Sequence, residues 1–338
     1  MRVSLFRQSL SVHLASIHDV PTVSDRAAFL GETIGLDEDT CSRVKAVVGA
    51  LASNVVKHAG GGTLILRGLS DNETGPSNRG LEILSLDSGP GMNVSRCLAD
   101  GYSTTGDAGI GLTEIKTLST QLDLYSLADR GSVICAQIWK TGAANARFDI
   151  GAICLPVQGE QLCGDSWSVR VSKDGLDIVM TDGLGHGIRA AQASDVALAV
   201  FAEQVDVAPG PMIQAMHDAM QDTCGAAALA VRLDSRDHRL TCAGVGNIGG
   251  IIMATPKPIG IVSLDGVVGD RIRKIREFDY ECRPADVLVL HSDGLKTHWS
   301  LDEFPGLKTK SASVIAGWLF NHLKRAKDDA TILVMRAQ

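Results

Sequence analysis

Four aspartates in the second half of the sequence stand where apolar, strand-like runs begin or end: Asp165, Asp182, Asp293 and Asp328. A single carboxylate in such a position is usually a cap or a solvated strand end, but several in one region favour a shared site. Clustered carboxylates without cysteine and with few histidines are typical of Mg²⁺ or Mn²⁺ rather than Zn²⁺. A pair of such ions lowers the pKa of a bridging water and so supplies a hydroxide for in-line attack on phosphorus.

The first half contains a different set of residues, which suits a nucleotide. Asn54 stands on a predicted helix, and Asp87 ends a strand-like run and opens a D-x-G-x-G turn. The glycines of this turn and of the stretch after it are Gly89, Gly91, Gly106, Gly109 and Gly111. A carboxylate at a strand end accepts from the exocyclic amine of adenine, and an asparagine oxygen suits the Mg²⁺ that carries phosphates. Glycines let the backbone approach a ligand closely, and helix N-termini favour phosphate.

The parts of this second set are weak signals when they are taken singly. The sequence DSGPG is an ordinary turn in most proteins, and GDAGIGL is an ordinary helix cap. Lys57 and His58 would reach phosphates from the helix that carries Asn54, but a solvated helix face explains them equally well. The order of the parts and the elements that carry them therefore decide the interpretation.

Hydrophobic periodicity predicts the elements that position the first set of candidate residues. Valines and a leucine at helical spacing predict a helix over 39–59, which ends at a run of glycines. Strand-like runs at 63–69 and 81–87 put Asp87 at a strand end, and a short helix is expected over 111–120.

The second half of the sequence alternates strands and helices differently. Strand-like runs are expected at 148–157, 166–172, 176–182, 226–234, 286–293 and 330–336, with helices at 187–201 and 211–220 and an amphipathic helix at 311–325. The small, polar stretch 140–147 between the halves is a plausible domain boundary. We therefore expect two domains, with a linker at 141–146.

The first half, over about residues 10–140, resembles the GHKL (Bergerat) ATP-binding fold, and in particular the RsbT-type serine kinases and anti-sigma kinases of bacterial partner switching. The resemblance rests on Asn54 in NVVKHAGGG, on DSGPG and on GYSTTGDAGIGL, in that order. It implies ATP with Mg²⁺ as cofactor, with Asn54 on Mg²⁺ and Asp87 on adenine. It further implies a pocket and phosphate lid formed by Gly89, Gly91, Gly106, Gly109 and Gly111, with Lys57 near the phosphates.

One position departs from this family. The family places a general-base glutamate four residues before the asparagine, and this sequence has Ala50 there. Alanine cannot accept a proton, so we expect nucleotide binding with impaired phosphoryl transfer. Two alternatives stay open: an ATP-sensing module that gates docking of a partner, and a bifunctional kinase and phosphatase whose base comes from another residue or from the partner.

The second half, over about residues 147–338, resembles the type 2C protein phosphatases of the SpoIIE and RsbX branch. GDSW, DGLGHG-x-x-AA-x-AS, GVGNI, SDGL and DDATILV occur in the expected order. The resemblance implies catalytic roles for Asp165, Asp182 and Asp293 and a pair of Mn²⁺ or Mg²⁺ ions held by Asp165, Asp182, the Gly183 carbonyl, Asp293 and Asp328. Asp328 is preferred to Asp329 because the first acid of the pair matches the motif. Gly244 and Asn247 are interpreted as turn formers, and His186 as a residue of the loop.

Together the resemblances predict an α+β chain with an ATP-binding α/β sandwich at 1–140 and a phosphatase α-β-β-α sandwich at 147–338. The families they point to act on a STAS-domain anti-sigma antagonist or a stressosome-like protein. The expected activity is dephosphorylation of a phosphoserine or phosphothreonine on that partner, with phosphorylation as the opposing reaction. Homodimerisation through the first domain is compatible with this family type.

Composition limits the alternatives. The chain has 338 residues, a net charge of −7 and a sequence pI near 5.7, without the basic excess of a nucleic-acid binder. Apolar residues make up 45% and charged residues 21%, as in ordinary globular domains. The eight cysteines form no CxxC pair, and the sequence shows neither a signal peptide nor a membrane-spanning run. We therefore expect a cytoplasmic protein with reduced cysteines.

Overall fold

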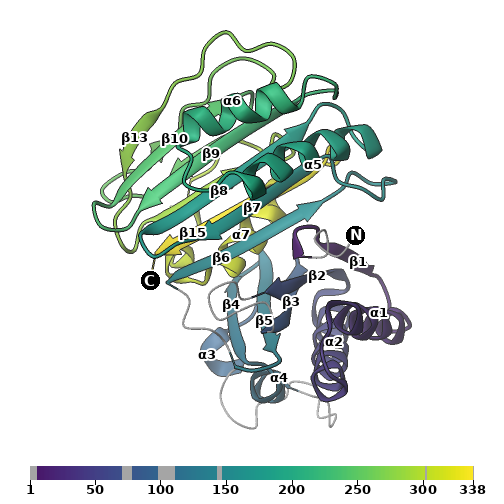
Figure 1. Cartoon of the computed structure of the whole chain (residues 1–338). Coiled ribbons are helices and arrows are strands. Elements are labelled where there is room, and N and C mark those ends of the chain that lie inside the picture. Colours follow the sequence, from purple (N-terminus) through teal and green to yellow (C-terminus); the bar gives the residue numbers. More distant parts are fainter. Residues whose placement is uncertain (1–5, 71–77, 98–110, 143–146, 301–302, 338) are drawn as a thin grey trace. The chain divides into compact units, whose positions relative to one another are not determined.

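The computed structural model describes residues 6–70, 78–97, 111–142, 147–300 and 303–337, which form two compact units (Figure 1). The first unit comprises Met1–Ala146 and Ser300–His322, and the second comprises Arg147–Trp299 and Leu323–Gln338. The sequence analysis placed all of 147–338 in one domain, so the segment 300–322 is grouped differently in the structure.

Two long helices form one layer of the first unit, α1 (Asp19–Ile34) and α2 (Glu38–Ala59). The Asp37 side chain caps α2 by accepting a 2.9 Å hydrogen bond from Thr40 N. Gly60 ends α2 in the left-handed conformation, with φ of 73°, which a glycine adopts without steric cost. The helix predicted over 39–59 is confirmed, and its apolar positions, including Val44, Val48 and Leu51, are buried.

The first unit contains one antiparallel sheet in the order β1-β2-β3-β5-β4. Its strands are β1 (Leu10–Leu14), β2 (Gly62–Ser70), β3 (Arg79–Asp87), β4 (Gln121–Leu127) and β5 (Gly131–Trp139). Two short helices, α3 (Val94–Cys97) and α4 (Leu112–Leu118), lie between β3 and β4 in the chain. The apolar residues on one face of the sheet join those of α1 and α2 in a common core.

Helix α7 (Ala312–Leu323) packs on the other face of this sheet. A Cβ built on Gly317 would lie 2.9 Å from Val133 Cγ1 and 3.2 Å from Leu86 Cδ2, so the helix approaches β5 and β3 closely. Trp318 is fully buried and meets Tyr125 edge to face, with ring centroids 4.7 Å apart. This packing explains why the segment 300–322 belongs to the first unit.

The second unit is a sandwich of two five-stranded antiparallel sheets. One sheet has the order β13-β10-β9-β8-β7, formed by Phe278–Glu281, Arg239–Val245, Ala226–Asp234, Gly175–Gly183 and Asp165–Val171. The other has the order β12-β11-β14-β15-β6, formed by Ile259–Gly260, Gly249–Ile252, Val287–His291, Ala330–Ala337 and Phe148–Leu155. The apolar side chains between the sheets form one core.

Helices α5 (Ile188–Glu203) and α6 (Pro209–Ala219) cover the first of these sheets, along β8 to β10 (Figure 1). Small and apolar side chains of α5 and α6 form a second core with that sheet. The chain is thus a mixed α/β protein whose second unit has two stacked sheets, as expected for a type 2C phosphatase. The helix predicted over 311–325, the candidate for the second helical layer, corresponds to α7, which is grouped with the first unit up to His322.

The structure also bears on two expectations from composition. All eight cysteines are free thiols. In the part of the chain that is described, every helix is too short or too polar to span a membrane.

Candidate functional site

Asp165 and Asp182 face each other across neighbouring strands. The register of β7 and β8 pairs these two residues directly, and the charge of Asp165 acts on Asp182. Asp165 is 2% exposed and accepts a 2.6 Å hydrogen bond from Ser292 Oγ. Ser292 follows β14 in the other sheet, so the sandwich brings the acidic residues of both sheets to one edge.

The second pair of candidate residues, Asp293 and Asp328, lies at the ends of β14 and β15. The charge of Asp328 acts on Asp293, and Asn247 Nδ2 donates to Asp293 Oδ2 at 2.7 Å. Asn247 was interpreted from the sequence as a turn former, but it orients a candidate metal ligand. Its sequence signal is the asparagine that ends the GVGN run after a strand.

Asp329 has a different environment from its neighbour Asp328. Its carboxylate accepts hydrogen bonds from Val157 N at 2.7 Å and from Gly164 N at 2.6 Å, and the residue is 2% exposed. Asp329 therefore fixes the loop that precedes Asp165, whereas Asp328 faces Asp293. This arrangement supports the choice of Asp328 as the candidate ligand.

The electrostatics of the cluster show an uncompensated negative charge. Burial, together with the charges of Asp165 and Asp293, raises the pKa of Asp182 to about 9. Burial also raises the pKa of Asp165 to about 7, although the hydrogen bond from Ser292 opposes this shift. Burial and the charge of Asp328 raise the pKa of Asp293. The carboxyl groups of Asp165 and Asp182 therefore keep a proton more readily than a free carboxyl group does, and a bound cation would replace it.

The donor set fits hard divalent cations. It consists of carboxylates with the Gly183 carbonyl nearby, and Gly183 lies so close to α5 that a Cβ would be 2.3 Å from Ala190 O. Within the described ranges, no group of three or more His, Cys, Asp or Glu side chains lies close enough together to hold a metal ion. The carboxyl groups instead lie in two pairs, Asp165 with Asp182 and Asp293 with Asp328.

The loop after Asp182 is tied to the loop before Asp165. His186 Nδ1 lies 2.8 Å from Glu160 Oε1, and a Cβ on Gly187 would lie 2.9 Å from Glu160 Oε2. His186 is exposed and contacts this glutamate. Its position agrees with its interpretation as a loop residue.

Asp87 in the first unit lies at the end of β3, as predicted. Its Oδ1 accepts a 2.9 Å hydrogen bond from Gly89 N, and burial raises the pKa of Asp87. A Cβ on Gly89 would be 2.7 Å from Ala59 Cβ, and one on Gly91, which has φ of 76°, would be 2.3 Å from Leu127 O. Both glycines are therefore required by close packing, whichever ligand the turn binds.

The other candidate nucleotide residues lie on α2 and α4. Asn54 is half-buried on α2, whereas Lys57 is exposed. Ala50, one turn before Asn54, is 6% exposed and packs in the apolar core. Gly111 precedes α4, with open space around its Cα. Gly106 and Gly109 lie outside the described residues.

Residues 172–338 match the protein-family model described as Stage II sporulation protein E (SpoIIE). The second half is also similar to the phosphoserine phosphatase RsbX of Bacillus subtilis strain 168, with 22% identity over 182 residues that cover 53% of this chain and 90% of RsbX. A crystal structure of RsbX in complex with magnesium shares the fold, with a TM-score of 0.51 and 20% identity over 58% of this chain and 98% of that chain. These similarities support a phosphatase domain of the RsbX and SpoIIE type.

The first half is similar to another protein of the same organism. The serine/threonine-protein kinase RsbT of Bacillus subtilis strain 168 is 27% identical over 129 residues, which cover 38% of this chain and 94% of RsbT. The two similarities fall on parts of the chain whose structures differ, a single sheet with long helices and a sandwich of two sheets.

Proposed function

We propose that the protein is a partner-switching phosphatase that removes phosphate from a phosphoserine or phosphothreonine of a STAS-domain antagonist. The observation that carries the proposal is the pairing of Asp165 with Asp182 across β7 and β8, with Ser292 bonded to Asp165 and the charge of Asp293 acting on Asp182. The match to the SpoIIE family model and the similarity to the phosphoserine phosphatase RsbX support it. The reaction is hydrolysis, in which water attacks phosphorus and the P–O bond to the serine or threonine oxygen breaks.

The metals of this site are Mn²⁺ or Mg²⁺ in the proposal. Asp165, Asp182, Asp293, Asp328 and the Gly183 carbonyl would hold them. A pair of bound ions supplies a water of lowered pKa and charge that stabilises the phosphoryl oxygens. The magnesium in the RsbX crystal structure belongs to that protein and supports this assignment by analogy.

The protein's own residues orient these ligands. Ser292 holds one oxygen of Asp165, and Asn247 holds one oxygen of Asp293, so each carboxylate has a fixed direction before metal binds. Asp329 fixes the loop before Asp165 through backbone amides. Such outer contacts keep the ligands within the narrow geometry that phosphate hydrolysis requires.

The first unit is an ATP-binding domain in the proposal, with Asn54 on Mg²⁺, Asp87 on adenine and the glycines of the DSGPG turn around the ligand. The similarity to the kinase RsbT supports it. Ala50 offers no base, and it packs in an apolar core. We therefore favour ATP binding with weak phosphoryl transfer over an efficient kinase.

One experiment tests both parts of the proposal. The full chain is incubated with a phosphorylated STAS-domain protein and Mn²⁺, and separately with the unphosphorylated protein and Mg·ATP, and intact mass reports the phosphate. We expect metal-dependent loss of phosphate in the first incubation. In the second we expect ATP binding with little transfer, and rapid transfer would favour the bifunctional alternative.

Two variants and a control make the first incubation specific. Asp182→Asn and Asp293→Asn should each lower the rate about 100-fold or more, because each removes a charged ligand. Asp195→Asn changes an exposed aspartate on α5 and should leave the rate unchanged. Retained metal-dependent turnover in both ligand variants would refute the assignment of the site.

A further inference from the structure

The segment 300–322 lies between two candidate metal ligands in the chain but belongs to the other unit. Asp293 precedes it and Asp328 follows it, whereas its contacts are with the sheet of the first unit. The segment is therefore joined at each end to a part of the chain that carries a candidate metal ligand.

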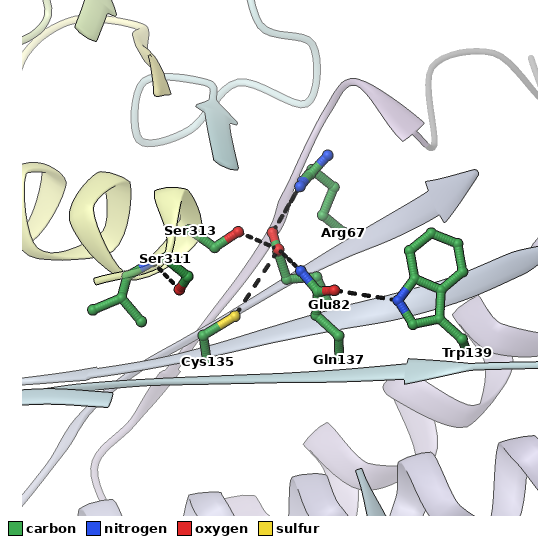
Figure 2. A network of polar contacts seen from close by, with 8 residues as sticks. Arg67, Glu82, Cys135, Gln137, Trp139, Ser311 and Ser313 are labelled. Atoms are coloured by element: carbon green, nitrogen blue, oxygen red, sulfur yellow. Dashed lines mark hydrogen bonds and ion pairs between the residues drawn. The ribbon is translucent and has the colours of Figure 1, made fainter. Parts of the chain in front are cut away.

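Polar contacts anchor the N-terminal part of α7. Ser313 Oγ donates to Glu82 Oε2 at 2.5 Å, and Ser311 N donates to Asp123 Oδ2 at 2.7 Å. Glu82, which is 1% exposed, also accepts hydrogen bonds from Arg67 at 2.8 Å and from Gln137 at 2.9 Å (Figure 2). Because a buried charge of this kind needs all of its partners, the position of α7 on the sheet is well defined.

The C-terminal part of α7 contacts the proposed nucleotide site. Asn321 Nδ2 donates to the backbone oxygen of Asp87 at 3.1 Å. The side chain of the same Asp87 is the proposed adenine ligand, and its Oδ1 accepts from Gly89 N. A ligand that pulls on the Asp87 carboxylate therefore acts on a residue to which α7 is directly bonded.

The chain just after α7 is bonded to the loop that carries Asp293. Lys296 N donates to Leu323 O at 3.0 Å, and Arg325 N donates to Gly294 O at 2.7 Å. Gly294 follows Asp293 in the sequence, and Arg325 stands shortly before Asp328. Leu323, the last residue of α7, and Arg325 are thus hydrogen-bonded to the loop that carries Asp293.

We propose that α7 transmits occupancy of the nucleotide site to the metal-binding loops, through the hydrogen bond from Asn321 to Asp87. The inference rests on the proposed nucleotide and metal sites and adds the regulation that links them. Because coupling between binding sites is reciprocal, ATP tightens metal binding by the same factor by which metal tightens ATP binding. The phosphatase would then respond to ATP without any phosphoryl transfer. This response would give a function to the first unit, in which Ala50 stands at the position of the general base.

Hydrogen exchange of the full chain tests this coupling without an activity measurement. ATP is added at a free Mg²⁺ concentration that a metal buffer keeps constant, and exchange is followed in 293–299 and 323–328. We expect ATP to slow exchange in both segments about 5-fold or more in the wild-type protein. Asn321→Ala should retain ATP binding and lose this response, whereas Gln214→Ala, which alters an exposed amide on α6, should respond like the wild type.

The outcomes separate this inference from the proposed function. ATP binding with unchanged exchange in the wild type overturns the coupling and leaves both sites standing. A full response in Asn321→Ala overturns the route through Asn321. Absence of ATP binding refutes the nucleotide site and the coupling together, while metal-dependent dephosphorylation in the incubation above would still support the phosphatase.

Discussion

Replacing Asp182 by asparagine should stabilise the metal-free protein and abolish its response to metal. Asp182 is packed against Asp165 in the folded state, and Asp293 adds a second negative charge nearby. Asparagine keeps the size of the side chain and removes one carboxyl from the cluster. A residue that only supports the fold would show the opposite effect, because most substitutions at buried positions destabilise.

The pKa of Asp182 gives the size and sign of the effect. Folding raises this pKa from 3.8 to about 9, so the folded protein holds a proton that the unfolded chain releases. The contribution of this proton to the free energy of unfolding is therefore complete below pH 3.8 and is lost as pH rises toward 9. Each pH unit costs about 1.4 kcal/mol, which gives an upper limit of about 4 kcal/mol at pH 7. Since Asp165 shares in the titration, we expect Asp182→Asn to recover about 2 kcal/mol.

Hydrogen exchange in β7 and β8 is a suitable assay, because it reports on the second unit alone. With a chelator at pH 7, Asp182→Asn should exchange more slowly than the wild type, and the difference should shrink toward pH 5. Saturating Mn²⁺ at about 100 times its Kd should stabilise the wild type by about 2.7 kcal/mol and leave Asp182→Asn unchanged. Faster exchange of the metal-free variant, or a metal response equal to that of the wild type, would refute the reasoning.

Two further predictions follow from contacts of neighbouring residues. Asp328→Asn should weaken Mn²⁺ binding about 10- to 100-fold in calorimetry. Asp329→Asn should instead lower the free energy of unfolding by about 2 kcal/mol, because it weakens the acceptor of two backbone amides. Weaker Mn²⁺ binding in Asp329→Asn together with lower stability in Asp328→Asn would exchange the two roles. Gly89→Ala should abolish ATP binding, since its Cβ would lie 2.7 Å from that of Ala59, and Gly260→Ala, which has open space around it, should not. Unchanged ATP affinity in Gly89→Ala would place the nucleotide elsewhere.

Local elements could be predicted closely from the sequence. The helix expected over 39–59 is Glu38–Ala59, and the strand expected over 226–234 is Ala226–Asp234. Both have an unbroken apolar pattern and end at glycine or a polar turn, so short-range forces determine their limits. The candidate aspartates could be found for the same reason, because each stands at the end of such a run.

The contacts within the site could not be predicted, because they depend on register and on pairing between distant strands. That Asp165 meets Asp182 follows from the alignment of β7 with β8, in which a slip of one residue would turn the side chain to the other face. Ser292 and Asn247 reach the carboxylates only because two sheets stack. Neither residue type marks a metal site by itself, so the sequence analysis interpreted Asn247 only as a turn former and assigned no role to Ser292.

Helix α7 shows why the sequence does not reveal to which unit a segment belongs. The sequence predicted an amphipathic helix, yet every residue from Ala312 to Phe320 except Gly317 is at most 4% exposed and Gly317 itself contacts β5. A helix that is apolar on all sides must be covered on all sides, and its pattern does not say by which element. Asn321 and Ser313 are polar, and they bond to Asp87 and Glu82 of the first sheet.

The family match at 172–338 includes this helix, so the part of the sequence that resembles a phosphatase contains a helix packed on the ATP-binding candidate. The proposed coupling depends on the bond from Asn321 to the backbone of Asp87, because that bond joins the helix to the proposed adenine ligand.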